Sequence, residues 1–436
     1  MNDQTKPYVE WFRNSAPYIN AHRNKTVVLM VGGEAVAHER FQSIVHDIAL
    51  LSSLGVKLVI VHGARTQIDR ALAKKGITSR VHRDLRVTDE QSLACVKQAV
   101  GALRAEIEAA LSMGVANSPM HGAGLKVCSG NFIVAKPMGI HDGVDFGHTG
   151  VVRRVECAAI REQLERGAIV LLPPIGYSPT GEVFNLSSED LATETAIALG
   201  ADKLILMCAE QGAQQEGELL CELNTQEAQQ LLAEASQTEE INRYLRAACQ
   251  ACSAGVPRAH LVSYREDGAL ISELYSRDGA GTLITVKSYE QLRQATIADV
   301  GGILELIRPL EEQGVLVRRS RELLEQEIDR FCVIDRDAAV IGCAALYPLD
   351  DDQTGELACF VVHPDYRSAS RGEQLLTYMV KQARAQQMGA LVVLTTQTAH
   401  WFLERGFAKI DVSALPLGKQ ALYNLQRNSS VFRLRL

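Results

Sequence analysis

The sequence predicts an α/β protein in which a domain with a mainly parallel sheet precedes a smaller α+β domain. The first observation behind this is that continuous apolar runs alternate with helical patterns, such as 39–54, over the first two-thirds of the chain. Strands of a parallel sheet that helices cover on both faces have this composition. The expected strands are 26–31, 57–61, 168–172 and 203–207.

The second observation is a change of pattern after residue 288. Several strand candidates then follow one another before a strand–turn–helix unit, whose helix is expected at 373–387, and this order is typical of an α+β domain. The remaining stretch of about 150 residues is a usual size for one domain. Its expected strands are 292–296, 331–335, 340–347, 357–362 and 391–395.

Glycine turns end two of the parallel strands, at Gly32-Gly33 and at 62–64. Ligands of such sheets bind at the carboxyl ends of the strands, so these turns mark the expected ligand site of the first domain.

Ahead of the sheet, residues 8–19 carry apolar side chains at helical spacing. This helix either packs on its own domain or is lent to a neighbouring subunit, and the sequence leaves both open.

Composition narrows the class of protein. The 436 residues are 47% hydrophobic and 22% charged with a net charge of −7, which suits a globular chain of two or three domains. The acidic balance argues against nucleic-acid binding, which rests on a basic surface, and no run of 18 apolar residues indicates a membrane span. Residues 1–18 contain no apolar signal core, so we expect a cytoplasmic protein.

The ten cysteines are scattered along the chain, which indicates reduced, buried thiols rather than disulfides. Cys249 and Cys252 form the one CxxC pair, inside a helical pattern at 244–254, and no second pair completes a zinc site. We therefore expect neither a bound metal nor a redox role.

Small and basic residues fill the turn after the expected strand at 357–362. Small side chains let backbone N–H groups surround an anion, the dipole of the following helix favours negative charge, and two arginines add positive charge. We interpret this turn as a pyrophosphate cradle. Its residues are Arg367, Ser368, Ala369, Ser370, Arg371 and Gly372.

This unit, together with the following strand and the segment 401–407, resembles the GNAT acetyltransferase family over about residues 288–436. The resemblance implies acetyl-CoA as cosubstrate, with its pantetheine arm in a splay beside the strand before the cradle. Two positions depart from the family. Ser370 replaces a glycine, which is tolerable at negative φ, and Phe402 replaces a hydroxyl often assigned as the acid. The arm would contact Cys359, Phe360, Val361 and Val362.

Acetyl transfer to an amine needs a base, because an α-amine is mostly protonated at neutral pH. Glu356 opens the strand beside the expected splay and is the candidate; the alternative is a solvated residue leaving the acidic turn at 350–352. Backbone N–H groups near Cys359 or Phe360 are expected to hold the thioester oxygen.

Arginines are the expected ligands of the acceptor, because a guanidinium matches a carboxylate with two parallel hydrogen bonds. The segments 315–322 and 422–429 resemble those of bacterial amino-acid N-acetyltransferases, which acetylate the α-amine of L-glutamate in the first step of arginine biosynthesis. A dicarboxylate needs two such partners. Arg318 and Arg427 are the expected ones, with Arg319 in reserve.

Four segments of the first domain, 30–33, 62–65, 85–89 and 183–190, resemble the amino acid kinase family. That family carries a lysine just before the glycines of its first strand, where this chain has Met30, and the stretch 241–251 offers no replacement for its second lysine. Phosphoryl transfer depends on such charges, so a kinase reaction is disfavoured although the fold is expected to persist.

Arginine-sensitive kinases of this family bind L-arginine near the end of the domain, and the matching segment here is 260–282. Glu273 would pair with the guanidinium, while the glycine turn from Gly279 to Thr282, which contains Gly281, would present N–H groups to the α-carboxylate. In the family the N-terminal segment links subunits into a ring, which implies a homo-oligomer, by resemblance a hexamer, and an effect of arginine across an interface. The resemblance also implicates Tyr18, Lys203, His260 and Ser276.

The sequence thus predicts an oligomerisation helix at 1–22, a non-catalytic arginine-sensing domain at 23–285 and an acetyltransferase domain at 286–436. The expected enzyme transfers acetyl from acetyl-CoA to L-glutamate and is inhibited by L-arginine. Two alternatives are an N-acetylglutamate kinase, which would consume ATP, and a regulator that binds arginine without turnover.

Overall fold

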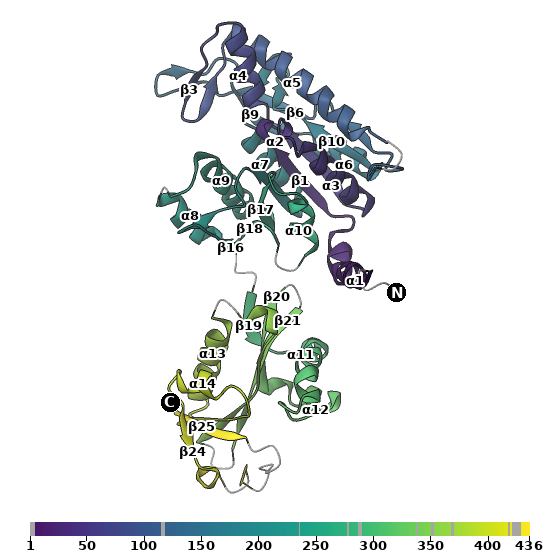
Figure 1. The fold of residues 1–436 in the computed structure, drawn as a ribbon. Helices are drawn as coiled ribbons and strands as arrows, with labels where there is room; N and C mark the ends of the chain where they lie inside the picture. The colour runs from purple at the N-terminus through teal and green to yellow at the C-terminus, as the bar shows by residue number, and fades with distance from the viewer. Residues whose placement is uncertain are drawn as a thin grey trace. The chain divides into compact units, whose positions relative to one another are not determined.

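The computed structural model shows a chain that divides into two compact units, residues 1–287 and 288–436 (Figure 1). The sequence placed the boundary nearby, at 285/286. Among the described helices, none is long and apolar enough to cross a membrane. The structure describes residues 5–114, 118–234, 236–276, 279–286, 290–336, 339–349, 353–367, 370–416, 419–420 and 429–436.

A large sheet forms the centre of the first unit (Figure 1). Its strands run in the order β16-β18-β17-β13-β1-β2-β10-β5, and neighbours pair in parallel except for antiparallel β17 and β18. All four strands that the apolar runs predicted belong to it, so the predicted fold class is confirmed. The strands are β1 (Thr26–Val31), β2 (Lys57–His62), β5 (Lys126–Cys128), β10 (Ala168–Leu172), β13 (Lys203–Cys208), β16 (Glu222–Asn224), β17 (Arg258–Ser263) and β18 (Thr282–Thr285).

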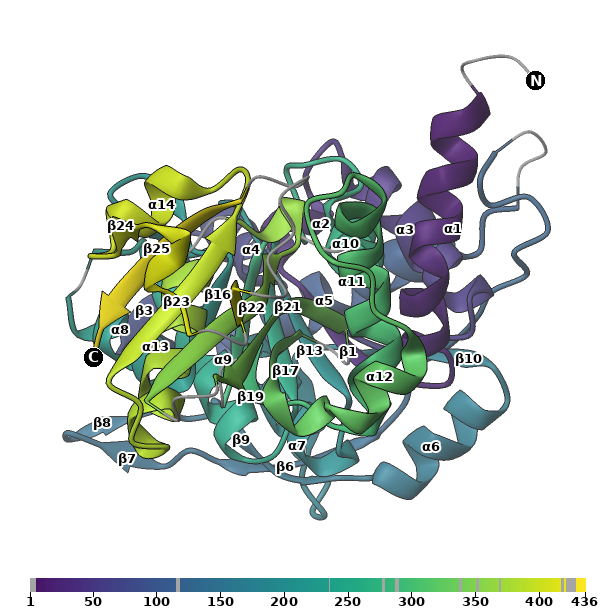
Figure 2. The same ribbon diagram turned by 90° about the horizontal axis from the view of Figure 1, so that it is seen from below.

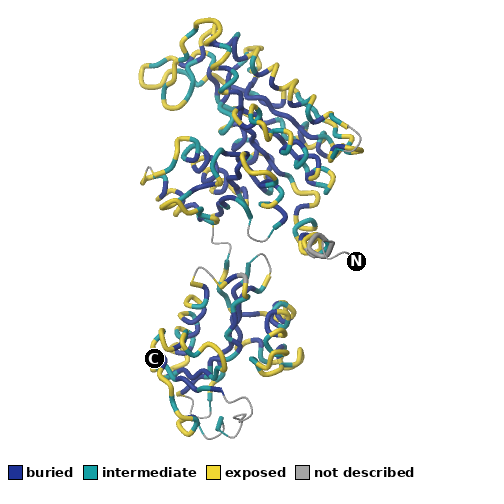
Figure 3. Tube along the Cα trace, viewed as in Figure 1, coloured by how far each residue is buried: buried dark blue, intermediate teal, exposed yellow. Residues whose placement is uncertain are grey.

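Both faces of this sheet are buried, as the dark core of Figure 3 shows. Side chains alternate between the faces along a strand, so Val28 and Met30 of β1 join one apolar cluster while Val27 and Leu29 join another. Residues of α7 and α9 complete the first cluster, and residues of α3 and α5 complete the second. Burial on both faces is why the strands are continuously apolar.

Local signals set where the helices of the first unit begin. The side chain of Asp89 accepts a hydrogen bond from the backbone N–H of Ser92 at 2.8 Å, and Asn224 and Glu227 form a capping box. The helices are α1 (Thr5–His22), α2 (Gly33–Val36), α3 (Phe41–Ser53), α4 (Arg65–Lys74), α5 (Glu90–Leu111), α6 (Cys157–Glu165), α7 (Ser188–Leu199), α8 (Thr225–Ala233), α9 (Glu239–Ser253) and α10 (Ala269–Tyr275).

Helix α1 packs on its own unit along part of one side. The Ser15 hydroxyl donates to the carbonyl of Tyr275 at 3.2 Å, and the His22 ring meets the Tyr275 ring edge-on at 5.4 Å between centroids. Trp11 and Phe12 are 50% and 61% exposed. Two large apolar side chains of the helix are therefore at least half exposed in this chain.

The strands outside the main sheet were not predicted. Most of them have two or three residues and carry too little periodicity to show in a sequence, whereas β6 and β9, with five and six residues, were missed despite their length. A smaller sheet has the order β12-β11-β6-β9, and three hairpins stand apart from it. These strands are β3 (Arg80–His82), β4 (Leu85–Val87), β6 (Ile133–Pro137), β7 (Ile140–His141), β8 (Val144–Asp145), β9 (Gly150–Val155), β11 (Ile175–Tyr177), β12 (Val183–Asn185), β14 (Gln214–Gln215) and β15 (Glu218–Leu219).

The second unit is one twisted sheet with helices on both faces (Figure 2). Its order is β19-β20-β21-β22-β23-β25-β24, and every neighbouring pair is antiparallel except β22 with β23. The α+β prediction is confirmed. The elements are β19 (Glu290–Gln294), α11 (Val300–Glu312), α12 (Arg321–Gln326), β20 (Phe331–Arg336), β21 (Ala339–Pro348), β22 (Thr354–Val362), α13 (Arg371–Ala385), β23 (Ala390–Thr395), α14 (Ala399–Leu403), β24 (Ala408–Ile410) and β25 (Ser430–Arg435).

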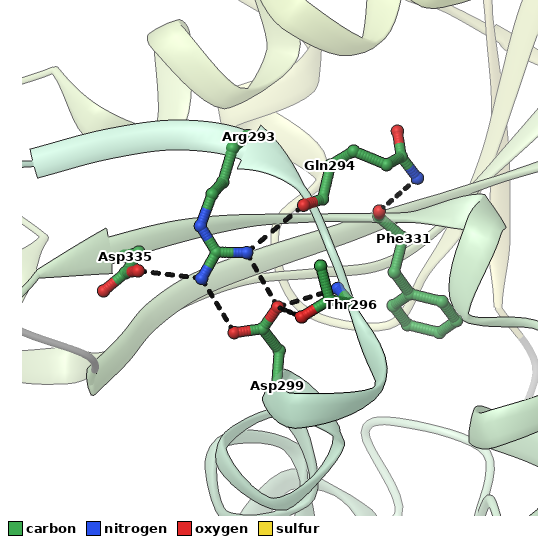
Figure 4. A network of polar contacts seen from close by, with 6 residues as sticks. All are labelled: Arg293, Gln294, Thr296, Asp299, Phe331 and Asp335. Carbon is green, nitrogen blue, oxygen red and sulfur yellow. Dashed lines mark hydrogen bonds and ion pairs between the residues drawn. The ribbon is translucent and has the colours of Figure 1, made fainter.

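A polar network ties β19 and β20 to the start of α11 (Figure 4). Arg293 donates to both carboxylate oxygens of Asp299, at 2.7 and 2.9 Å, and to Asp335 at 2.8 Å. Asp299 also accepts the backbone N–H of Thr296 at 2.7 Å. These bonds, those from Arg293 first, lower the pKa of Asp299 to about 2. The network stabilises the start of the second unit most strongly where Asp299 is ionised.

Replacing Arg293 by Met should lower the free energy of unfolding of the second unit by about 2 kcal/mol at neutral pH, because two carboxylates lose charge-assisted bonds. The pKa of Asp299 is about 2 when folded and lies near ~4 when unfolded, so this stabilisation is present above pH ~4 and disappears toward pH ~2. Urea unfolding of variant and wild type should therefore differ less at low pH. Exposed Arg308, changed to Met, is the control; an equal difference at both pH values would contradict the assignment.

Candidate active site

Strands β22 and β23 separate part-way along their length. Their parallel pairing joins Thr354 to Ala390 and Glu356 to Val392, and beyond Glu356 no pair joins them in the described part of the chain. A cavity of about 650 Å³ borders residues 356–362 of β22 and the end of β23. The splay that the sequence predicted is therefore present, with Glu356 at its apex.

A bulge in β22 faces this cavity. Across β21, Val361 pairs with Cys343 and Ala358 pairs with Ala345, so Cys359 and Phe360 together stand opposite one residue. Cys359 has a φ of +47°, in the left-handed region that a non-glycine residue seldom adopts. The register leaves the backbone at 359–360 outside the ladders to β21 and β23 as the structure describes them. That backbone borders the cavity, where a ligand can bond to it.

One wall of the cavity is aromatic. The ring centroids of Phe360 and Trp401 are 5.3 Å apart, and those of Trp401 and Phe402 are 5.0 Å apart. The Arg405 guanidinium lies 4.1 Å from the centre of the Trp401 ring. Phe402 is buried and offers no proton donor, but four residues with hydroxyl groups line the cavity, and of these the sequence reasoning had named only Ser370. They are Ser370, Thr395, Thr398 and Ser429.

The described part of the cradle also lines the cavity, through Arg367, Ser370 and Gly372. Ser370 has a φ of +55°, so the expectation of a negative φ at this position was wrong. The turn needs the left-handed conformation just before α13, and the serine adopts it at some cost in strain. A Cβ at Gly372 would lie 2.9 Å from the Trp401 ring, so the indole requires glycine there. Ser368 and Ala369 lie outside the described residues.

Arg371 does not supply charge to the cradle, contrary to the sequence prediction. Its guanidinium bonds the Glu290 carboxylate at 2.5 to 2.9 Å and the Tyr366 carbonyl at 3.2 Å. The Arg371 side chain is only 11% exposed and is absent from the described cavity lining. Arg371 and Glu290 are 81 residues apart in the sequence, so no local pattern could predict that they pair.

Glu356 is not the solvated residue of the alternative interpretation. Its side chain is 15% exposed and lines the cavity. A carboxylate oxygen of Glu356 lies 2.6 Å from the Lys419 ammonium, which the sequence reasoning missed. Lys419 lies 63 residues after Glu356 in the sequence, so only the folded chain shows that the two side chains face each other.

The arginines are distributed differently from the prediction. Arg318 is exposed and absent from the described lining, whereas Arg319, held in reserve, lines the cavity. The backbone N–H of Arg319 donates to Glu311 at 2.9 Å, and its guanidinium lies 5.9 Å from the Tyr347 ring centroid. Adjacent residues in an extended segment point to opposite sides, and the sequence did not show which one faced inward. Arg427 lies outside the described residues.

A second cavity, of about 430 Å³, lies at the glycine turns of β1 and β2. Met30 is fully buried between sheet and helices and does not line it. The cations of the described lining are Arg65 and Arg243, and Arg243 is bonded to Glu189 at 3.2 Å. Carboxylates outnumber them, which disfavours a polyphosphate. These are Glu34, Glu189, Glu210, Glu239 and Glu240.

Several residues that were expected to bind arginine lie close together in the first unit, where they form hydrogen bonds with one another. One Glu273 oxygen lies 2.6 Å from the His260 ring, and the other accepts the N–H groups of Ala280 and Gly281 at 2.7 and 2.9 Å. Burial raises the pKa of Glu273, but these bonds outweigh it and lower the pKa below its usual value. The carboxylate and the N–H groups predicted to bind opposite ends of one ligand therefore neutralise each other here.

The remaining expected arginine-site residues surround this centre. The Lys203 ammonium lies 3.4 Å from the His260 ring, and Ser276 ends α10 with its hydroxyl on the Ser272 carbonyl at 2.6 Å. A Cβ at Gly279 would lie 2.6 Å from the Glu273 carboxylate. Tyr18 lies half-buried on α1, which contacts α10.

The CxxC pair lies in the core, not at a site. Cys249 and Cys252 are buried on α9, and burial raises their pKa values to about 11 and about 12. Both thiols are therefore protonated at neutral pH. Within the residues that the structure describes, no cluster of His, Cys, Asp and Glu side chains is arranged to hold a metal ion.

Known proteins share both units. The amino acid kinase family model matches residues 25–263, and the acetyltransferase (GNAT) family model matches residues 302–407. An amino-acid acetyltransferase from Ectopseudomonas mendocina is 55% identical over 98% of this chain and 99% of its own. The chain belongs to the amino-acid acetyltransferase family.

Two solved structures of a family member cover the whole chain. N-acetylglutamate synthase from Neisseria gonorrhoeae with coenzyme A and L-arginine has a TM-score of 0.89 at 37% identity. The structure with coenzyme A and N-acetyl-glutamate has a TM-score of 0.63 at 38% identity, and each match covers 98% of this chain and 99% of the other. The predictions of a GNAT acetyltransferase and of an amino acid kinase fold are confirmed.

Arg367 and Arg371 give a matched test of the cradle. Arg367→Met should raise the KM for acetyl-CoA about fivefold with little change in stability, because an exposed cation beside the cavity is lost. Arg371→Met should instead lower the free energy of unfolding by roughly 2 kcal/mol, because Glu290 loses its short ion pair with Arg371 and keeps the longer one with Arg336 at 3.3 Å. Steady-state kinetics and thermal unfolding separate the two effects. The reverse outcome, with Arg371 controlling KM and Arg367 stability, would show that the roles are exchanged.

Proposed function

We propose that this acetyltransferase moves the acetyl group of acetyl-CoA to the α-amine of L-glutamate. The observation that carries the proposal is the cavity in the β22–β23 splay, which has Glu356 at its apex and Arg319 on its wall. A carboxylate and a guanidinium in one cavity suit an acceptor with both an ammonium and carboxylates. The Neisseria enzyme bound to N-acetyl-glutamate supports this choice of acceptor.

The chemistry follows from the cavity's residues. Glu356 takes a proton from the substrate ammonium, directly or through one water, and the free amine attacks the thioester carbonyl. The backbone N–H groups at Cys359 and Phe360, which the bulge leaves outside the strand ladders, stabilise the oxygen of the tetrahedral intermediate. CoA then leaves as thiolate or thiol, with its pantetheine arm along residues 359–362 and its pyrophosphate at 367–372.

The two alternative functions fit the geometry less well. A kinase needs cations around transferring phosphoryl groups, and the cavity at the glycine turns is lined mostly by carboxylates while Met30 is buried. A regulator without turnover would have no use for a splayed strand with a charged apex. The first unit therefore serves regulation and assembly in this proposal.

Release of free CoA tests the proposal. The purified chain should release CoA when L-glutamate and acetyl-CoA are both present, and should not consume ATP with N-acetylglutamate. Glu356→Gln should lower kcat by about 10² or more, because the amide cannot accept the proton. Glu373→Gln, another acidic residue of the cavity lining, is the matched control and should stay within about threefold. A normal kcat for Glu356→Gln would place the base elsewhere.

We also propose that L-arginine inhibits the enzyme from the Glu273 centre, as the arginine-bound Neisseria structure suggests. In the structure Glu273 holds the loop at 280–281 and the His260 ring. An arginine guanidinium would take over the carboxylate, and the released N–H groups would become free for the ligand's α-carboxylate. Binding therefore requires the loop to rearrange, which gives arginine a means of changing conformation.

Glu273→Gln should weaken inhibition by arginine at least about tenfold, because the amide keeps an acceptor for the loop but loses the charge that attracts a guanidinium. Activity without arginine should change by less than about twofold. Exposed Glu266, seven residues earlier, provides the control as Glu266→Gln. Inhibition curves measured by CoA release report the result, and an unchanged curve for Glu273→Gln would move the site elsewhere.

The N-terminal helix supports a third proposal, that the chain assembles as a homo-oligomer, by family resemblance a hexamer. Trp11 and Phe12 on α1 are half-exposed or more, and exposed aromatic side chains gathered on a helix favour a protein partner. Light scattering should give a multiple of the 47.7 kDa chain mass, and a monomer would contradict assembly.

A further inference from the structure

Lys419 and Glu356 form an ion pair inside the acetyltransferase cavity, where both side chains line the wall. The ammonium and carboxylate are 2.6 Å apart, and the side chains are 20% and 15% exposed. Charges that have lost most of their water need partners, so any ligand that takes one of these groups must also satisfy the other. The pair therefore constrains what enters the apex of the splay.

A backbone hydrogen bond to Pro416 ties Lys419 to the described residues before it. The backbone N–H of Lys419 donates to the Pro416 carbonyl at 3.0 Å. The neighbouring Leu415 is 3% exposed and belongs to the same apolar cluster as Val392, which is the register partner of Glu356. Glu356 and the segment that carries Leu415 thus both adjoin Val392 of β23, so the approach of carboxylate and ammonium is built into the fold.

Three charged side chains of the described cavity lining match the charges of the proposed acceptor. Arg319 and Lys419 contribute two positive charges and Glu356 one negative charge, whereas L-glutamate brings one ammonium and two carboxylates. Every charge finds an opposite partner if the substrate ammonium binds Glu356 and each carboxylate binds one cation. The geometry points to Lys419 as the ligand of the substrate's α-carboxylate, an assignment that rests on the proposed function.

The choice of the α-carboxylate follows from distance. The α-amine and α-carboxylate share one carbon, so their N and O atoms lie roughly 3 Å apart. Because Lys419 lies 2.6 Å from Glu356, an ammonium bound to Glu356 brings its own α-carboxylate within reach of Lys419. The more distant side-chain carboxylate is left for Arg319.

This arrangement works as an exchange of ion pairs. In the structure Lys419 neutralises Glu356. When the amino acid binds, its ammonium replaces Lys419 at Glu356, and Lys419 turns to the α-carboxylate. A substrate without that carboxylate leaves Lys419 competing for Glu356, so Lys419 selects α-amino acids over simple amines and α-amides.

A substrate panel tests the assignment on the full-length enzyme. The panel contains L-glutamate, L-isoglutamine, whose α-carboxylate is an amide, and L-glutamine, whose side-chain carboxylate is an amide. Lys419→Met should raise the KM for L-glutamate at least about tenfold while the KM for acetyl-CoA stays within about twofold. The preference for glutamate over isoglutamine should fall about tenfold or more, and the preference for glutamate over glutamine should not. Lys419→Arg should recover part of the loss.

Matched variants and the wild type distinguish a wrong assignment of Lys419 from a misfolded variant and from a wrong proposed function. Lys409→Met removes an exposed lysine of β24 and should leave all three substrates unaffected. Thermal unfolding shows whether Lys419→Met remains folded, and the ratio between substrates in one variant is independent of how much enzyme is active. An unchanged KM for glutamate, an unchanged ratio of glutamate to isoglutamine, or a change confined to glutamine would each overturn the assignment. If the wild type releases no CoA with glutamate, the proposed function fails instead.

Discussion

The backbone of β22 is the constraint on which the second unit depends. Its pairing with β23 stops at Glu356, and the bulge at Cys359 takes two more residues out of the ladder with β21. Backbone polar groups that leave a ladder need other partners, and here they border a cavity large enough for a ligand. The strained φ of Cys359 belongs to the same arrangement, because strain of this kind persists where the surrounding fold holds it.

The first unit keeps the fold of the amino acid kinase family although Met30 stands where the related kinases have a lysine. The stability of its sheet comes from apolar side chains buried on both faces, and Met30 adds to that burial where the related kinases place a lysine. The turns at the strand ends still enclose a cavity, but its lining is mainly carboxylate. A sheet of this kind does not need a reactive site in order to fold, so the unit is available for sensing and assembly.

The sequence shows which charged residues a segment contains. Only the fold decides which residues those charges contact. Arg371 was placed in the right turn, yet its partner is Glu290, 81 residues earlier. Glu273 was placed in the right segment, yet its carboxylate holds the loop that was expected to help it bind a ligand. In both cases the predicted charge is present and the tertiary structure had already satisfied it. Burial makes an unpaired charge costly, so such pairs form wherever the fold allows.

By itself the sequence determined the two fold types and the main strands, because apolar periodicity and glycine turns are local properties. It did not determine which of Arg318 and Arg319 faces the cavity, that Ser370 adopts a positive φ, or that Lys419 meets Glu356. Those outcomes depend on strand register, on the splay and on contacts between residues far apart in the chain. Only the tertiary structure decides them, because side-chain direction and charge pairing are properties of the folded chain.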